Sequence, residues 1–238
     1  MTWAPDIDAW QPWHPAEAAR ILGGTDVPWA VAGGWAIDLH LGRQTREHGD
    51  LEVAIPRGLF PRFRRMLTEF DLYEAAGGVR LLGTDEVPEH HQVWVLDRSI
   101  RKWRMDIFLE PGDERTWVSH RDERITLPMA EAVRRTPEGV PYLAPGSVLL
   151  AKAKHARDKD EADLAHALPT LTADENAGWA RGSRSRTPAT GGWGRSPGKE
   201  FPGKRTTLGV DGISGSRGDH ADAARGGGGL RGRRRERR

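Results

Sequence analysis

Apolar and polar residues alternate with two different periods along residues 1–175, and these periods predict helices and strands. Apolar residues spaced three or four apart predict helices, whereas a period of two or a short apolar run predicts strands. The predicted helices cover residues 14–22, 34–42 and 59–70, and two more within 145–168 join near Arg157 and Asp158. The predicted strands cover residues 28–33, 51–56, 78–84, 91–98 and 102–110. This order predicts an α+β fold in which helices flank a mixed β-sheet.

The composition changes near residue 176, where Gly, Arg, Ser and Pro replace the periodic pattern. Residues 176–238 hold 15 of the 36 Lys and Arg and 5 of the 34 Asp and Glu, which leaves 21 basic and 29 acidic residues in 1–175 and a net charge of −8 there. A segment so poor in apolar residues is predicted to be a disordered tail. The basic tail is predicted to bind nucleic acid only weakly, if at all, and the acidic remainder gives no reason to expect such binding.

Three features of the sequence exclude whole classes of chemistry or location. The chain has no cysteine, which excludes disulfides, zinc sites built from thiolates and cysteine nucleophiles. The first ten residues lack the basic and apolar regions of a secretory signal, and no run approaches the roughly 18 apolar residues that a membrane helix needs. The prediction is a cytoplasmic protein with no membrane partner.

Two acidic residues, Asp50 and Glu52, stand one residue apart at the start of an otherwise apolar strand. Side chains alternate along a strand, so both acids share one face while Leu51, Val53 and Ile55 share the other. Carboxylates this close repel each other unless a cation lies between them, and oxygen ligands favour magnesium over zinc. The alternative interpretation is a solvated strand face at the edge of a sheet.

A third acid and a pair of glycines strengthen the metal-site interpretation. Asp106 lies on the less apolar face of the strand 102–110 and completes a three-carboxylate cluster if the two strands are neighbours. Gly33 and Gly34 stand between a predicted strand and a predicted helix, where backbone N–H groups and the positive helix end hold phosphate.

The motifs VAGGWAIDLHLGRQTREHGDLEVAI, WRMDIFLEPGD and PGSVLLAKAKHARDKDEADL together resemble the nucleotidyltransferase superfamily related to DNA polymerase beta. Within it they are most similar to the antibiotic-modifying branch, which includes aminoglycoside and lincosamide nucleotidyltransferases. The resemblance implies a catalytic core over residues 1–140 and a C-terminal helical part over 141–175, followed by the tail over 176–238. Relatives usually continue with an ordered helix there, so we hypothesise that the tail is the product of a frameshift.

The resemblance also implies roles for individual residues. The catalytic and metal-binding acids would be Asp50, Glu52 and Asp106, although many relatives have Asp in place of Glu52. Contacts to the nucleotide would come from Gly33, Gly34, Arg46, Lys154 and Lys159, and an alternative for Arg46 is pairing with Glu47. His48 is expected to orient a carboxylate.

The implied activity is transfer of a nucleoside monophosphate, AMP from ATP, to a hydroxyl of a small molecule, with Mg²⁺ as the cofactor. Asp106 would also accept the proton of that hydroxyl. Two alternatives stay open at the level of sequence: a catalytically weak binding protein such as an antitoxin component, and a nucleic-acid-binding protein that acts through its tail. The sequence leaves the acceptor, the preferred nucleotide and the oligomeric state open.

Overall fold

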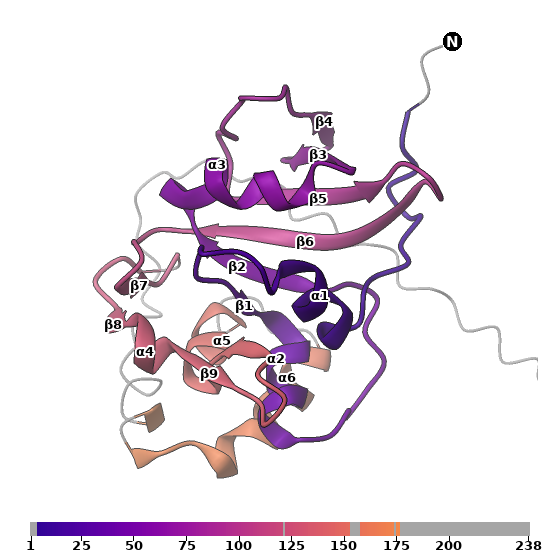
Figure 1. The fold of residues 1–238 in the computed structure, drawn as a ribbon. Helices are drawn as coiled ribbons and strands as arrows, with labels where there is room; N and C mark the ends of the chain where they lie inside the picture. Colours follow the sequence, from indigo (N-terminus) through magenta and orange to yellow (C-terminus); the bar gives the residue numbers. More distant parts are fainter. Residues whose placement is uncertain (1–3, 121, 153–157, 174, 177–238) are drawn as a thin grey trace, which may run out of the picture. The chain divides into compact units, whose positions relative to one another are not determined.

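The computed structural model describes residues 4–120, 122–152, 158–173 and 175–176, and it has the predicted α+β fold (Figure 1). The described helices are α1 (Pro15–Leu22), α2 (Gly33–Leu41), α3 (Phe60–Phe63), α4 (Met129–Ala132), α5 (Pro145–Lys152) and α6 (Asp158–Ala167). The described strands are β1 (Ala30–Val31), β2 (Glu52–Pro56), β3 (Phe70–Ala75), β4 (Val79–Leu81), β5 (Gln92–Asp97), β6 (Lys102–Glu110), β7 (Thr116–Val118), β8 (Thr126–Pro128), β9 (Val133–Arg135) and β10 (Pro141–Leu143). Short 3₁₀ turns cover Arg57–Leu59, Arg64–Leu67 and Leu168–Thr170.

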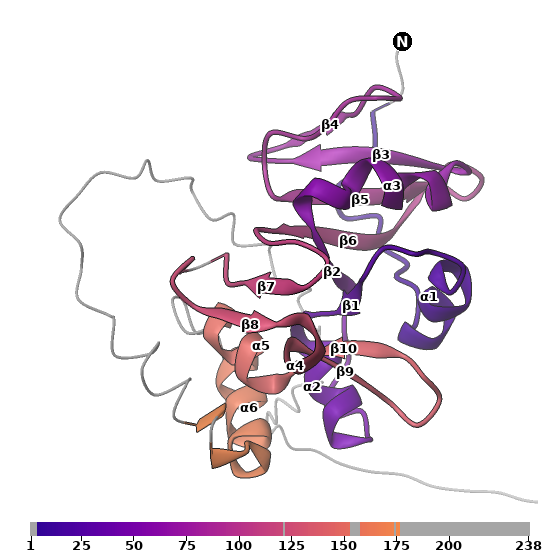
Figure 2. The same ribbon diagram turned by 60° about the vertical axis from the view of Figure 1, so that its left-hand side comes forward.

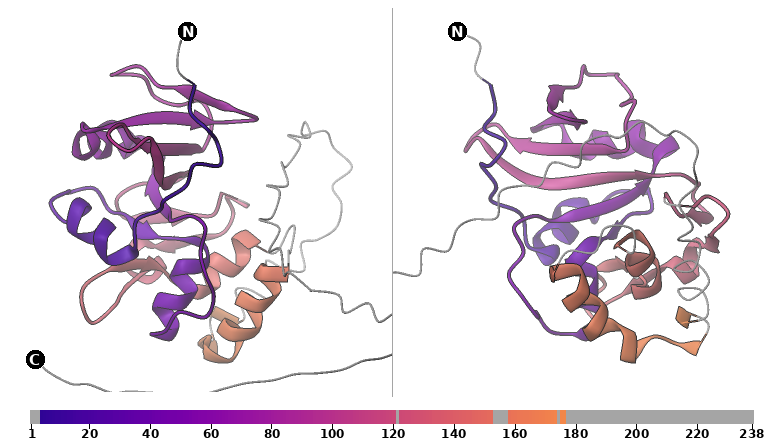
Figure 3. Two further views of the ribbon diagram at one scale, coloured as in Figure 1. Left: turned by 90° about the vertical axis from the view of Figure 1, so that its right-hand side faces the viewer. Right: turned by 180° about the vertical axis from the view of Figure 1, so that it is seen from behind.

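Eight of these strands form one mixed sheet in the order β4-β3-β5-β6-β2-β1-β10-β9, and β7 and β8 form a separate hairpin. Strands β2 and β6 run parallel at the centre of the sheet, and β5 pairs with β6 in the antiparallel direction. Helices α1 and α3 lie on one side of the sheet, and α5 and α6 lie on the other (Figure 3). Every residue of β2 from Val53 to Pro56 is buried.

Helix α2 connects the sheet to the C-terminal helices. It begins directly after β1 and packs against both α5 and α6 (Figure 2). It ends as predicted at Gly42, whose positive φ of 66° lets its N–H bond the carbonyls of Asp38 and Leu39. Because α2 leads into residues 43–51, its position sets where the acidic pair enters the sheet.

Residues 59–70 depart from the predicted continuous helix. The structure has the four-residue α3 between two 3₁₀ turns, and Phe70 already belongs to β3. Phe60, Phe63 and Leu67 are buried on one side at spacings of three and four, which is the periodicity that predicted a helix. The apolar spacing was read correctly, but the backbone forms a short α-helix and two 3₁₀ turns instead of one continuous helix.

The sheet also continues past residue 140. Strand β10 pairs in parallel with β1, with Val31 opposite Tyr142, and in the antiparallel direction with β9. The predicted division at 140 therefore falls between two paired strands. The predicted tail lies, from residue 177 on, outside the described residues. Among the described helices, none is long and apolar enough to cross a membrane.

Candidate active site

The register of β2 and β6 brings two of the predicted acids side by side. Glu52 opens β2, and its direct partner on β6 is Asp106. Asp50 lies two residues before Glu52, in the loop that leads into β2, and its charge acts on Asp106. Asp106 is buried, with 4% of its surface exposed, while Asp50 and Glu52 are partly exposed. The neighbouring strands are the arrangement that a three-carboxylate cluster requires.

Asp106 has an environment that opposes its ionised form. Burial raises the pKa of this carboxyl well above its ordinary value, and the charges of Glu52 and Asp50 raise it further. Gln92 on β5 opposes the shift, because its Nε2 donates to Asp106 Oδ2 at 2.6 Å. Oδ1 is buried. The Trp94 side chain also lowers the pKa of Asp106, so the carboxylate has one oxygen held by Gln92 and a second, Oδ1, with no hydrogen bond of ordinary length from the described residues.

These residues fit a hard divalent cation, although they do not yet form a closed ligand set. In the part of the chain that the structure describes, no three Asp, Glu or His side chains are gathered closely enough to hold a metal ion. The donor set nevertheless consists of carboxylate oxygens on adjacent strands, which magnesium prefers. The buried Oδ1 of Asp106 is the acceptor that a cation would satisfy.

The two glycines at the start of α2 leave room for side chains of the acidic loop, residues 43–51. Gly33 has a φ of 59°, and a Cβ there would overlap the carboxylate of Glu52. A Cβ on Gly34 would overlap the guanidinium of Arg46 and lie 2.8 Å from Cε1 of His48. The glycine turn, Glu52 and Arg46 are therefore in direct contact, so the predicted phosphate turn lies beside the acids.

Asp38, in the middle of α2, anchors the acidic loop. Its buried carboxylate accepts a hydrogen bond from Thr45 Oγ1 at 2.5 Å and pairs with His48 Nε2 at 2.6 Å. The His48 ring stacks on Trp35 with centroids 4.3 Å apart. Burial lowers the pKa of His48, and the hydrogen bond to Asp38 opposes this only in part. His48 thus orients a carboxylate as predicted, but that carboxylate belongs to Asp38.

A second anchor joins the same loop to α6. Arg46 donates from Nε and Nη2 to the two oxygens of Asp163, each at 3.1 Å, and from Nη1 to the carbonyl of Glu47 at 3.1 Å. Lys152, at the end of α5, donates to Asp163 at 2.8 Å and to Asp160 at 2.7 Å. Burial would lower the pKa of Lys152, but these two bonds and the charges of Asp163 and Glu52 raise it above its ordinary value. The alternative pairing of Arg46 with the Glu47 side chain is not among the contacts of Arg46 in the structure.

The lysines of the C-terminal helices differ in their access to this site. Lys159 is exposed on α6, and Lys154 lies outside the described residues. Lys152 is the described lysine whose charge interacts with Glu52. Sequence reasoning did not assign roles to Asp38, Gln92 or Asp163. The available signal was the spacing of Asp160 and Asp163, which places two acids on the same, buried face of a helix.

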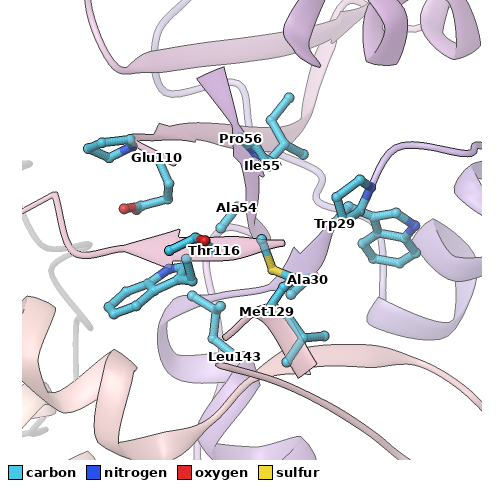
Figure 4. A pocket seen from close by; sticks show the side chains of 13 residues that line it. Trp29, Ala30, Ala54, Ile55, Pro56, Glu110, Thr116, Met129 and Leu143 are labelled. Carbon is cyan, nitrogen blue, oxygen red and sulfur yellow. The ribbon is translucent and has the colours of Figure 1, made fainter. Parts of the chain in front are cut away.

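A small cavity lies away from the carboxylates, next to the later residues of β2 (Figure 4). Its volume is about 10 Å³, and its walls include Ala54, Pro56, Trp117, Met129 and Leu143. A space of this size holds about one water molecule. It is therefore too small for a nucleotide or an acceptor. A larger cavity, of about 490 Å³, lies at the hairpin of β3 and β4 with Glu74, Arg80 and His90 in its walls. The carboxylate-bearing face of β2 and β6 is the candidate site because of the register of Glu52 with Asp106.

Comparison with known proteins identifies the class to which this arrangement is similar. Residues 17–82 match the family model of aminoglycoside-2''-adenylyltransferase. The matched segment contains the glycine turn, the acidic loop and the pair Asp50 and Glu52, whereas Asp106 and Asp163 lie beyond it. The match confirms the resemblance to the aminoglycoside branch of the nucleotidyltransferases. Among curated proteins, no sequence matches the chain significantly.

Two solved structures of one protein are similar to the chain at low identity. The solution structure of the antibiotic-resistance factor ANT(2'')-Ia is 18% identical, with a TM-score of 0.46, over 72% of this chain and 91% of that chain. The crystal structure of ANT(2'')-Ia in complex with adenylyl-2''-tobramycin is 17% identical, with a TM-score of 0.48, over 72% of this chain and 97% of that chain. These values describe likeness only and assign no residue of this chain a role.

Proposed function

We propose that this protein is a magnesium-dependent nucleotidyltransferase that transfers AMP from ATP to a hydroxyl of an aminoglycoside-type acceptor. The observation that carries the proposal is the register of Glu52 with Asp106, with Asp50 two residues before Glu52 and the glycine turn against it. The family match over residues 17–82 supports the same reaction class.

Asp50, Glu52 and Asp106 would hold the metal. Magnesium, when bound, neutralises charge on the triphosphate and lowers the pKa of the acceptor hydroxyl. With Oδ1 of Asp106 toward the metal, the second lone pair of Oδ2, whose first accepts from Gln92, would take the hydroxyl proton. The hydroxyl oxygen bonds to the α-phosphorus, and pyrophosphate leaves.

The phosphate contacts would come from the start of α2 and from cations beside it. Backbone N–H groups at Gly33 and Gly34 begin a nine-residue helix whose Ala32 cap makes no side-chain hydrogen bond. The guanidinium of Arg46 lies against Gly34, and the charge of Lys152 acts on Glu52. The roles predicted for Lys154 and Lys159 stay predictions.

The net negative charge of residues 1–175 favours a cationic acceptor. Residues 1–175 carry a net charge of −8, and aminoglycosides carry several protonated amines. An acidic surface raises the local concentration of such a molecule and its rate of association. The same surface would repel nucleic acid, which argues against a polynucleotide acceptor for these residues.

The test is pyrophosphate release by the full-length protein with ATP, Mg²⁺ and a panel of aminoglycosides, a lincosamide and a nucleoside. We expect release with at least one aminoglycoside and a loss of about 100-fold or more in Asp50→Asn. Asp85→Asn removes the same charge from an exposed residue and should leave the rate unchanged. Folded wild-type protein that binds ATP but releases pyrophosphate with none of the acceptors would favour the catalytically weak binding protein instead.

A further inference from the structure

Asp163 lies at the centre of a buried ionic network, and its two cationic partners are more exposed than it is. Only 1% of the Asp163 side chain is exposed, against 23% for Arg46 and 13% for Lys152. The carboxylate is thus sealed behind two positive groups. An ion pair that served stability alone would be a costly choice here, because removing three charges from water is expensive even when they are paired.

Among the described residues, the hydrogen bonds of the network leave donors on both cations. Arg46 has five N–H donors, and its bonds to Asp163 and Glu47 engage three of them. Lys152 has three donors, and Asp160 and Asp163 engage two. A bidentate bond to one carboxylate fixes the plane of the Arg46 guanidinium, so the direction of its other donors is fixed as well.

Both cations lie close enough to the candidate active site to interact with it. Arg46 is joined to Asp163 on α6 by two hydrogen bonds, and Lys152 is joined to the same carboxylate. Arg46 also contacts the glycine turn through Gly34. Arg46 therefore lies between α6 and the start of α2, and Lys152 shares its partner Asp163.

We propose that Asp163 is a positioning residue for the nucleotide: it holds Arg46 and Lys152 from behind so that their remaining donors face the β- and γ-phosphates. This rests on the proposed function and deepens it, because it assigns the polyphosphate to a cation pair that α6 sets in place. Of the two cations, Asp160 contacts Lys152, whereas Asp163 contacts both, so we expect a smaller contribution from Asp160. Helix α6 thereby contributes to the site indirectly, because Asp163 positions the two cations and does not itself contact the nucleotide.

The experiment compares the affinities of the full-length protein for ATP and AMP, measured by titration calorimetry with Mg²⁺. Asp163→Glu keeps the charge but moves the carboxylate by one methylene, and Glu161→Asp makes a change of the same size at an exposed position of α6. We expect the preference for ATP over AMP to fall by about tenfold in Asp163→Glu. Glu161→Asp should keep the wild-type preference. A role in stability alone would lower the melting temperature without changing this ratio.

The outcomes separate the inference from the proposed function. A folded Asp163→Glu protein whose preference for ATP stays within about twofold of wild type would overturn the positioning role. Wild-type protein that binds neither nucleotide would overturn the proposed function, and the inference with it. If Asp163→Glu does not fold, Arg46→Lys breaks the same bidentate bond from the other side and keeps the charge, with the exposed Arg43→Lys as its control. An unchanged ratio in Arg46→Lys would then overturn the inference.

Discussion

Ionised Asp106 destabilises the metal-free protein, because its neighbours do not fully offset the free energy of burying its charge. Gln92 satisfies one oxygen, but burial and two nearby carboxylates disfavour the negative charge. A group whose folded pKa is raised above its unfolded value binds protons more readily in the folded state. For a carboxyl this means that the folded protein loses stability as the pH rises above the unfolded value of 3.8.

Asp106→Asn should therefore stabilise the metal-free protein at pH 7 while it abolishes turnover. Asn keeps an oxygen that accepts from Gln92 and removes the buried charge, so we expect a gain on the order of 1 kcal/mol. Thermal unfolding in a chelating buffer measures this, and the gain should shrink as the pH falls toward 3.8, because wild-type Asp106 is then protonated. A variant that is less stable than wild type at pH 7 would contradict this account of the carboxylate.

At this scale the sequence identified residues whose signal is local. Asp50, Glu52, Gly33 and Gly34 stand within twenty residues of one another, and strand alternation predicted one shared face for the acids, although β2 begins only at Glu52. Asp163 could not be found in this way, because its partner Arg46 lies 117 positions away in the chain. Such a contact depends on how α2 and α6 pack, which no periodicity encodes.

Among the elements, the hairpin of β3 and β4 is fastened to the segment before β5 by one carboxylate. Glu74 on β3 is 5% exposed, and it accepts from the backbone N–H of His90 at 2.6 Å and from Arg80 Nη2 at 2.5 Å. Burial would raise the pKa of Glu74, but these hydrogen bonds, with that of the His90 ring, lower it to about 2. The ionised form therefore stabilises this end of the sheet.

Glu74→Gln should lower stability at neutral pH and flatten its acid dependence. A depressed carboxyl pKa gives stability that is present above the unfolded value of 4.5 and is lost as the pH falls toward about 2. Because Arg80 is half exposed, we expect a difference of about 1–3 kcal/mol between wild type and variant at pH 7. Urea unfolding of both proteins between pH 2 and pH 6 measures it. A difference that stays constant over this range would show that the charge of Glu74 is not the cause.

The elements that the sequence predicted well are the long ones with a clear period. Helix α1 begins and ends within one residue of its prediction, and β6 covers the predicted residues 102–110. Strands β7 to β10 and helix α4 were not predicted, because elements of three or four residues are too short to show a period. The six-residue β3 was also missed, and its first residue, Phe70, was placed in the predicted helix 59–70. Strand β1 has only two residues, and its neighbours on both sides define it.

For the whole molecule, removal of residues 177–238 is predicted to leave the folded part intact. Glu175 accepts from Arg134 at 2.9 Å and from the backbone of Thr172 at 2.9 Å, so a cut after Asn176 keeps these contacts. The removed segment lacks apolar periodicity and carries 15 basic and 5 acidic residues. We expect a change in stability of about 1 kcal/mol or less and weaker binding to heparin. Calorimetry of both chains tests the first point, and a large fall in melting temperature would contradict it.

The position of β10 beside β1 also affects how the chain acquires its structure during synthesis. Val31 pairs with Tyr142, and Arg46 bonds to Asp163. During synthesis the early member of each pair emerges from the ribosome long before its partner. Contacts so distant along the chain slow folding, and an unpaired strand edge offers itself to other chains in the meantime. A fragment that ends at residue 140 would hold all three acids yet leave one edge of β1 open. We therefore expect it to aggregate rather than to fold as an independent core.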